Sequence, residues 1–332
     1  MAKTYKEWMQ PLRDLEEGIA NLEALAAKET GEKAAEIEET IRRFRQRRDN
    51  YIETLFSRLG AWERVLLARA EQRPYTNDYI ERLFTEFMEL SGDRAAADDH
   101  AIVGGPALFQ SRPVMIVGHQ KGRNLAERTN RNYAMAKPEG YRKAIRLFEM
   151  AERFRMPVVT FVDTPAADPG VESESRGISE AIASSMLSMF QLTVPVVSVV
   201  IGEGGSGGAL GIAVANRVLM LEHSIYSVIP PEGCAAILWR APEKGPQAAA
   251  ALQLTAQTAH AMGIVEEIIA EPFGGAHRDY ELSANNVRTS ITKHLAELDT
   301  LGPDAVKEDR YWKFRKIGLH GHQERAAVSV PS

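Results

Sequence analysis

One stretch of the sequence, residues 194–215, constrains the fold more than any other. It begins with a run of mostly β-branched residues that ends at Ile201 and is interrupted only by Pro195 and Ser198. Such a run is typical of a strand that is buried on both faces of a sheet. G-E-G-G-S-G-G follows at residues 202–208, and then small apolar residues that favour a helix. We therefore expect a buried strand, a glycine loop and a helix, in this order.

The glycine loop is the first place to look for chemistry. Glycine lets a ligand approach the main chain closely. The first amides of a helix have no partner within the helix and lie at its positive end. A negative charge that develops there finds hydrogen-bond donors already oriented. The doubled pairs Gly204-Gly205 and Gly207-Gly208 suit such an oxyanion hole, so these four are the candidate catalytic residues.

Two other interpretations of the same glycines stay open on spacing alone. Gly202, Gly204 and Gly207 fit G-x-G-x-x-G, and Glu222 ends the next apolar run about 20 residues further on. That spacing is formally a dinucleotide-binding fingerprint, although the helix between the two parts is short. The third interpretation is tight packing of a helix against a strand, with no chemistry.

Composition narrows the class of protein. The 332 residues are 44% hydrophobic and 26% charged, as in globular proteins. The net charge of −5 predicts no overall attraction to nucleic acid. No apolar run is long enough to span a bilayer, and the N-terminus lacks an apolar signal core. The single cysteine, Cys234, excludes an intrachain disulfide and a multi-cysteine metal site. We expect a cytoplasmic protein with no membrane contact and no metal on this chain.

The chain divides into three parts. Residues 1–72 carry apolar positions at alternating spacings of three and four, with a break at Thr30-Gly31, which predicts a helical hairpin. The arginine-rich stretch 42–48 within it is interpreted as a solvated helix face, because acidic and apolar residues are interleaved with it. Residues 73–300 form the main domain. Residues 301–332 are expected to be a partly disordered C-terminal tail.

The main domain alternates strand-like runs with helical segments, which predicts an α/β fold. Functional loops should follow the carboxyl ends of the strands, and three qualify: 119–123, 163–170 and 202–208. Lys121 and Arg123 in the first loop are candidates to bind a phosphate, such as the 3′-phosphate of CoA, or they simply occupy an exposed loop.

Motifs of several enzyme classes are absent. The sequence has no P-loop, no G-x-S-x-G and no H-E-x-x-H. No histidine has an acidic partner at motif spacing, so no general base is assigned. An oxyanion hole without an acid–base pair suggests that a substrate or cofactor supplies the base, as in enolate chemistry on a thioester.

The whole sequence resembles the alpha subunits of the acetyl-CoA carboxylase carboxyltransferases of bacteria and plastids, over roughly residues 5–315. The motifs that carry this resemblance are R-P-Y-T at 73–76, G-D-R at 92–94, A-I-V-G-G at 101–105, R-P-V-M-I-V-G-H-Q-K-G-R at 112–123, P-E-G-Y-R-K-A at 138–144, M-A-E-R-F at 150–154, D-T-P at 163–165, G-E-G-G-S-G-G-A-L at 202–210, Y-S-V-I at 226–229, P-E-G-C-A-A-I-L-W at 231–239 and G-G-A-H-R at 274–278.

The resemblance implies a ClpP/crotonase-type fold of repeated ββα units with an N-terminal helical extension. It implies a carboxyltransferase that moves the carboxyl group from carboxybiotin, held on a separate carrier protein, to acetyl-CoA, giving malonyl-CoA for fatty-acid synthesis. It also implies partners: a beta subunit with a zinc ribbon in an α2β2 heterotetramer, the biotin carboxyl carrier protein and biotin carboxylase. The dinucleotide interpretation then loses its support.

The resemblance also implies roles for residues. The Gly207 and Gly208 amides, supported by Gly204 and Gly205, would stabilise the oxyanion on the biotin ureido group, and biotin would then deprotonate the acetyl methyl group. The acyl-CoA oxyanion hole would lie mainly on the beta subunit. Substrate binding is expected from Lys121, Arg123, Asp168, Pro169 and Gly170.

Two loops depart from the family pattern. The family reads D-T-P-G-A-Y-P-G where this chain has Ala166 and Asp168 in place of the glycine and the tyrosine. The family loop R-N-F-G-M-P-x-P-E-G is R-N-Y-A-M-A-K-P-E-G here, at residues 131–140. These changes suggest a paralogue with a different acyl-CoA acceptor or carrier. Another acyl-CoA enzyme of the crotonase fold, and a non-catalytic scaffold for a beta-type partner, are the remaining alternatives.

Overall fold

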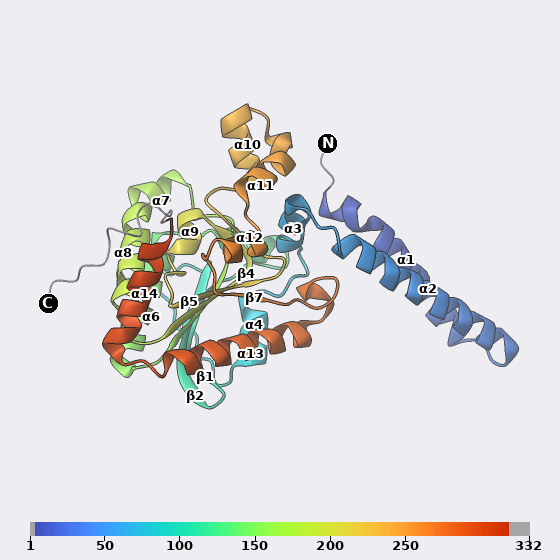
Figure 1. Ribbon diagram of the computed structural model, residues 1–332, viewed down its shortest axis with the longest axis horizontal. Coiled ribbons are helices and arrows are strands. Elements are labelled where there is room, and N and C mark those ends of the chain that lie inside the picture. Colours follow the sequence, from blue (N-terminus) through green and yellow to red (C-terminus); the bar gives the residue numbers. More distant parts are fainter. Residues whose placement is uncertain (1–3, 319–332) are drawn as a thin grey trace.

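A computed structural model describes residues 4–318. Its centre is one sheet in the order β1-β2-β3-β4-β5-β7, and β6 pairs with the far end of β4 (Figure 1). β1 and β2 form an antiparallel hairpin, and the other neighbouring strands are parallel. The strands are β1 (Ile102–Phe109), β2 (Arg112–His119), β3 (Val158–Thr164), β4 (Val196–Gly205), β5 (Arg217–Leu221), β6 (Ile225–Ser227) and β7 (Glu267–Ile269).

Both faces of this sheet are covered, because its strands are apolar on both sides. Successive side chains of β4 alternate between two cores: Val196 and Val200 lie in one, and Val197, Val199 and Ile201 lie in the other. The first core is closed by α6 (Pro138–Phe154) and α8 (Ile178–Gln191), and the second by α4 (Thr76–Leu83) and α13 (Tyr280–Leu298). The expected α/β fold is therefore confirmed.

The glycine-rich stretch differs from the expectation at one point. The predicted loop 202–208 is not a loop, because β4 continues to Gly205 and Glu203–Gly205 pair with β6. A short helix, α9 (Ser206–Leu210), begins at the next residue. The whole change of direction is made at Ser206, whose φ of 51° is in the left-handed region that non-glycine residues seldom adopt.

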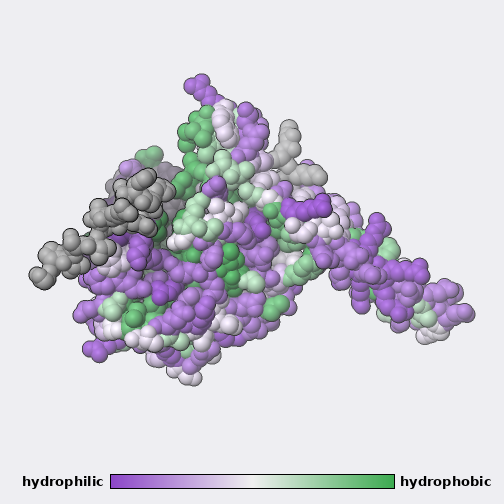
Figure 2. Space-filling model, viewed as in Figure 1, coloured by the Kyte–Doolittle hydropathy of each residue, from purple (hydrophilic) through white to green (hydrophobic). Residues whose placement is uncertain are grey.

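Three further helices precede α4 and the sheet in the described chain. α1 (Tyr5–Ala26) and α2 (Glu32–Phe56) pack on each other and extend away from the sheet as an arm, while α3 (Ala61–Ala68) lies against the body (Figure 1). The arm has a small core of its own, in which Met9 and Leu12 pack against Ile52. Most of its surface is therefore polar, as Figure 2 shows along the projecting helices.

The predicted C-terminal tail, residues 301–332, begins with a helix. Pro303–Lys316 form α14, and residues 319–332, on which the expectation of partial disorder also rests, lie outside the described residues. Arg310 explains why the helix is fixed: its buried guanidinium donates to the carbonyls of Met189, Leu192 and Val194 and to Oδ1 of Asn216. These four hydrogen bonds from Arg310 attach α14 to the body.

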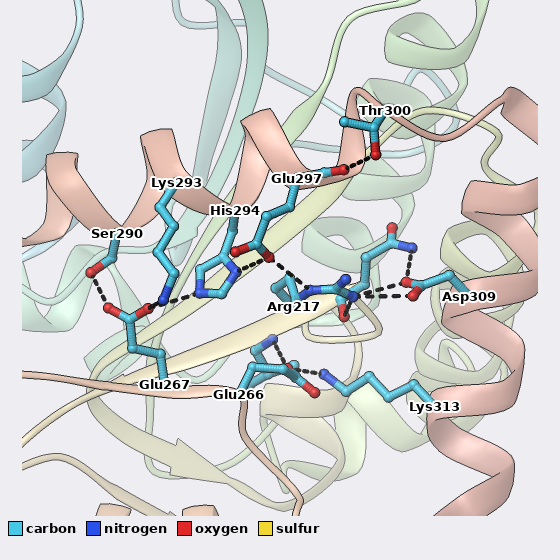
Figure 3. A network of polar contacts seen from close by, with 12 residues as sticks. Arg217, Glu266, Glu267, Ser290, Lys293, His294, Glu297, Thr300, Asp309 and Lys313 are labelled. Carbon is cyan, nitrogen blue, oxygen red and sulfur yellow. Dashed lines mark hydrogen bonds and ion pairs between the residues drawn. The ribbon is translucent and has the colours of Figure 1, made fainter.

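A polar network on the outside of the sheet fixes the same helix. Asp309 and Lys313 of α14 bind Arg217 and Glu266, which lie at and beside the ends of β5 and β7 (Figure 3). In the same view His294 of α13 contacts Glu267 at 2.9 Å and Glu297 at 3.2 Å. Both C-terminal helices are thereby attached to the edge of the sheet.

The remaining helices lie around the carboxyl ends of the strands or project beyond them. They are α5 (Leu125–Asn130), α7 (Val171–Ser175), α10 (Pro231–Trp239), α11 (Gly245–Leu252) and α12 (Ala256–Ala261). α10 and α11 stand out from the body, and Figure 2 shows apolar surface on this projection. Ile237 and Leu238 of α10 are exposed, together with Val228 before it. No helix among residues 4–318 has the length and apolar character that crossing a membrane requires.

Candidate active site

The carboxyl ends of β2, β3 and β4 meet at one edge of the sheet, because these three strands are parallel neighbours. Three charged side chains from these ends come together there. The Lys121 ammonium lies 2.7 Å from Oδ1 of Asp163 and 3.1 Å from Oε1 of Glu203. Two of the three loops predicted to be functional, 119–123 and 163–170, are thus joined to the glycine-rich stretch through one cation.

Arg69, at the end of α3, extends this charged cluster. Its Nε lies 2.7 Å from Glu203 and its Nη1 lies 2.6 Å from Glu232 at the start of α10. Burial alone would raise the pKa of Glu203, but Lys121 and Arg69 outweigh it and lower that pKa. The cluster is therefore a set of charged pairs that connects α3, three strand ends and α10.

The local sequence explains how Asp163 and Glu203 come so close. The pairing of β3 with β4 slips between Val162 and Thr164, so that the Glu203 amide donates to Oδ1 of Asp163 at 2.9 Å. A side chain at Gly202 has no room there, because its Cβ would lie 2.3 Å from the same oxygen. Gly202 is thus a packing glycine, not part of a dinucleotide fingerprint.

Gly204 and Gly205 are packing glycines as well. A Cβ on Gly204 would lie 2.6 Å from the Tyr226 ring, and one on Gly205 would lie 1.9 Å from the Pro165 carbonyl oxygen. Both residues are buried within β4. Gly205 lets the 163–170 loop lie directly on the strand that leads to Ser206, and Gly204 leaves room for the ring of Tyr226. Their expected contribution to an oxyanion hole stays a prediction.

Gly207 and Gly208 hold the free donors. They occupy the first turn of α9, and neither amide finds an acceptor within residues 4–318. Gly207 is half-buried, and a Cβ added to it would make only ordinary contact, 3.7 Å from Ile182. Gly208 is buried, and its carbonyl accepts a 3.1 Å hydrogen bond from the hydroxyl of Tyr141. This pair has the open amides that an oxyanion hole requires.

The 163–170 loop is fixed from the opposite side by Asp168. Its Oδ1 accepts from Asn132 at 3.0 Å, and its other carboxylate oxygen accepts from Ser173. Although burial opposes it, these two hydrogen bonds lower the pKa of Asp168. Pro169 is exposed, and Gly170 caps α7. The two loops that depart from the family pattern are therefore in direct contact, and the Asp168 carboxylate links them.

Arg123 and Lys121 both form ion pairs with carboxylates of this chain. Arg123 stacks on Tyr75 at 3.9 Å from the ring centre, pairs with Asp78 and donates to the carbonyls of Glu71 and Arg73. The Lys121 side chain is mostly buried between its two carboxylates. A phosphate would have to displace these partners, so the geometry does not favour the expected phosphate contact.

A cavity of about 200 Å³ opens over the charged cluster. It is lined by Arg69, Glu71, Tyr75, Lys121, Gly122, Arg128, Tyr133, Pro165 and Glu203. A second, smaller hollow beside it reaches Gly204 and Gly205 and is bounded by Ile229 and Pro230. The cavity and the open glycine amides thus lie along the same edge of the sheet.

Sequence reasoning missed Arg69, Glu232 and Tyr141. The sequence does indicate that Glu203 has a cationic partner, because a buried carboxylate must be paired with a positive charge. Nothing in the sequence pairs Arg69 with it, since 134 residues separate them. His119, at the end of β2, is fully buried, and burial and the Lys121 ammonium lower its pKa to about 3. Its ring is therefore neutral at physiological pH and is shielded from solvent.

The fold is shared with known carboxyltransferases. A transcarboxylase 12S structure with methylmalonyl-coenzyme A bound superposes with a TM-score of 0.57 at 21% identity, covering 69% of this chain and 42% of that one. A Pseudomonas malonate decarboxylase hetero-tetramer in complex with coenzyme A gives a TM-score of 0.54 at 18% identity, covering 65% and 86%. The chain therefore has the crotonase-type fold that the sequence led us to expect.

Sequence similarity specifies the family within this fold. Residues 5–318 match the family described as acetyl co-enzyme A carboxylase carboxyltransferase-like, and the chain belongs to that family. The acetyl-coenzyme A carboxylase carboxyl transferase subunit alpha of Halorhodospira halophila is 50% identical over 318 residues, which cover 96% of this chain and 99% of that protein. Its counterpart in Geobacter metallireducens is 51% identical, covering 96% and 98%.

Proposed function

We propose that this chain is the alpha-type subunit of a biotin-dependent carboxyltransferase that transfers a carboxyl group from carboxybiotin to acetyl-CoA. The observation that carries the proposal is the pair of open amides at Gly207 and Gly208, at the carboxyl ends of the strands. Amides fixed in this way stabilise an oxyanion without moving, because the sheet has already oriented them. The full-length likeness to subunits alpha of acetyl-coenzyme A carboxylase supports the same reaction.

The residues at this edge suit the biotin ureido group. When bound, N-carboxylated biotin supplies the carboxyl group and, after losing it, the base. The chain's part is to donate hydrogen bonds from Gly207 and Gly208 to the ureido oxygen. Tyr141 holds the Gly208 peptide in place, and the contact of the 163–170 loop with Gly208 keeps the donors rigid.

The reaction needs further chains on this proposal. The partners are a beta subunit that binds the CoA thioester and carries its own oxyanion hole, the biotin carboxyl carrier protein, and biotin carboxylase. The Pseudomonas malonate decarboxylase of the same fold is a hetero-tetramer, which supports an assembly of more than one chain type. Residues 1–72, which include the arm and α3, are proposed to be an extension, and residues 73–300 are proposed to be the carboxyltransferase domain.

A second candidate is a related carboxyltransferase with another acyl-CoA acceptor. The observation that favours it is the Asp168–Asn132 hydrogen bond, which joins the two loops that differ from the family pattern. Asn132 itself follows the family pattern, but the Asp168 amide also donates to the carbonyl of Ala136 at 2.9 Å, and Ala136 departs from that pattern. Two of the changed positions therefore contact each other, which points to one altered wall of the site.

The test of the proposed function is reconstitution. The chain is co-purified with the beta-type subunit of its own organism, and malonyl-CoA-dependent carboxylation of free biocytin is measured. We expect a stable complex and turnover. A complex without turnover on malonyl-CoA that carboxylates biocytin from methylmalonyl-CoA would establish the second candidate. If no complex forms, or if neither thioester reacts, both proposals fail.

A further inference from the structure

Three consecutive residues between α5 and α6 have a left-handed backbone. Asn132, Tyr133 and Ala134 have φ values of 43°, 54° and 62°. Asparagine adopts this conformation more readily than most residues, but tyrosine and alanine seldom do. The family pattern has glycine at position 134, so this chain keeps the conformation without the residue that adopts it most easily. We refer to residues 132–134 as the left-handed turn.

Hydrogen bonds hold the left-handed turn in place. Nδ2 of Asn132 donates to the carbonyl of Met135 at 2.8 Å and to Oδ1 of Asp168 at 3.0 Å. Just beyond the turn, the carbonyl of Ala136 accepts from the Asp168 amide at 2.9 Å. Strained backbone that its surroundings hold in this way is typical of functional sites. The side chain that the turn presents is therefore a candidate for contact with a ligand.

Tyr133 is that side chain. It is 45% exposed, and it lines the 200 Å³ cavity over the charged cluster. Pro165 lines the same cavity, and the loop to which Pro165 belongs packs on Gly205 and Gly208. The left-handed turn thus places an aromatic ring at a cavity that borders the stretch with the open amides.

The lining of this cavity indicates the kind of ligand. Tyr133, Tyr75 and Pro165 offer apolar surface, while Lys121 and Glu203 bring charged groups. Such a lining suits a ring that has apolar faces and a hydrogen-bonding edge. The fused rings of biotin have both, because the ureido group forms one edge of the bicycle. The nucleotide of a CoA thioester fits less well, since its phosphates would meet cations that already form ion pairs within the chain.

We propose that the ring of Tyr133 packs against the fused rings of biotin while the amides of Gly207 and Gly208 bind the ureido oxygen. This inference rests on the proposed function, and it names the contact that fixes where the biotin ring lies on this chain. The left-handed turn holds the tyrosine at the cavity before biotin arrives, so binding does not have to order that residue. Tyr133 is thus a substrate-binding residue that takes no part in proton transfer.

The test measures the KM for biocytin and the KM for malonyl-CoA in the reconstituted complex. Tyr133→Ala should raise the KM for biocytin about tenfold, the upper value for one aromatic contact, and should leave the KM for malonyl-CoA within about twofold. Tyr133→Phe should keep both constants within about twofold, because the ring and not the hydroxyl makes the contact. Tyr311→Ala is the matched control, because Tyr311 is also 45% exposed but lies on α14, and it should leave both constants unchanged.

A titration without thioester separates a failure of this inference from a failure of the proposed function. Biotin methyl ester is added to the whole chain, with its beta-type partner or without it, and its saturable binding should weaken about tenfold in the Tyr133→Ala variant. Binding that depends on Tyr133 without any turnover would end the proposed function and support the biotin contact. Equal binding by the Tyr133→Ala variant and the unaltered chain, no binding at all, or a rise in the KM for malonyl-CoA as large as that for biocytin would each overturn the inference.

Discussion

Gly207 and Gly208, in the first turn of α9, differ in how much room each has for a side chain. Gly208 is required for packing, since a Cβ there would lie 2.4 Å from the Ala167 nitrogen and 2.5 Å from the Ala166 carbonyl carbon. Gly207 has space for a side chain, and neither glycine has a positive φ that would demand glycine. Packing and catalysis can therefore be separated by substitution within one dipeptide.

This separation gives a stability prediction. Gly208→Ala should lower the free energy of unfolding by about 2–3 kcal/mol, because the methyl group would overpack rigid backbone. Gly207→Ala should change it by less than about 1 kcal/mol. Urea unfolding of the two variants beside the unaltered chain measures both values. Equal losses would mean that the 163–170 loop does not pack on Gly208 as described.

Glu271 gives a prediction about pH. It is buried, and the guanidinium of Arg73 and the neighbouring His223 outweigh burial and lower its pKa to about 2, from an ordinary value of 4.5. A carboxylate whose pKa is lower in the folded state adds stability above its unfolded pKa, and that stability is lost as the pH falls towards the folded pKa. The size of this contribution is roughly 3 kcal/mol.

The measurement compares the unaltered chain with Glu271→Gln by urea unfolding between pH 7 and pH 3. The difference in unfolding free energy should be largest at neutral pH and should shrink as the pH falls below about 4.5. Glu308→Gln, an exposed control on α14, should show a small and flat difference. A difference for Glu271→Gln that is independent of pH would contradict the account.

At the scale of elements, α14 shows that the C-terminal part of the described chain belongs to the body. Arg310 is fully buried and donates to the main-chain carbonyls of three buried residues. Arg310→Met should therefore cost about 3–5 kcal/mol, since each buried carbonyl left without a donor costs about 1–3 kcal/mol. Lys307→Met, on the exposed side of α14, should cost less than about 0.5 kcal/mol.

Thermal or urea unfolding of both α14 variants tests this prediction. If the Arg310→Met variant has the same unfolding free energy as the unaltered chain, α14 does not contribute to the stability of the body. It would then behave as the tail that the sequence predicts. The sequence does not predict this helix, because only Val306 and Arg310 of its fourteen residues are buried. It therefore lacks the apolar stripe from which an amphipathic helix is recognised.

The two contacting loops give the prediction about acceptor choice. Replacing Ala166 by glycine and Asp168 by tyrosine restores the family pattern and removes the hydrogen bonds from Asn132 and Ser173. We expect the ratio of kcat/KM for acetyl-CoA to that for propionyl-CoA to change at least about tenfold, the usual value of one methylene in a fitted pocket. Competition between the two thioesters in the reconstituted complex measures it, and an unchanged ratio would show that these loops do not choose the acceptor.

Across the whole molecule, the sequence predicts the parts that depend on local pattern. The β1–β2 hairpin and the buried strands β3 and β4 follow from apolar runs and turn residues, and the convergence of their carboxyl ends follows from parallel order. What the sequence did not predict depends on long-range contacts. Glu203–Gly205 lie in a strand because β6 pairs with them, and Arg69 joins the site because α3 returns to β4.

The same reasoning explains the two cations expected to meet a phosphate. Position in a loop after a strand places Lys121 at the carboxyl ends of the parallel strands, where the structure has it, and its functional role stays a prediction. It could not show that Asp163 and Glu203 flank Lys121, or that Arg123 is held on Tyr75, because those partners come from other strands and from the segment before α4.

The activity of a Gly207→Val variant in the reconstituted complex shows whether the amides of α9 stabilise the oxyanion of the reaction. We expect kcat/KM for biocytin carboxylation to fall about 100- to 1,000-fold, as when one oxyanion donor is lost, because the branched side chain blocks approach to the amides. The complex should still assemble, and the unfolding midpoint should stay close to that of the unaltered chain, since a Cβ added to Gly207 would make only ordinary contact with Ile182. Full activity in an assembled Gly207→Val complex would show that the open amides of α9 do not stabilise the reaction's oxyanion.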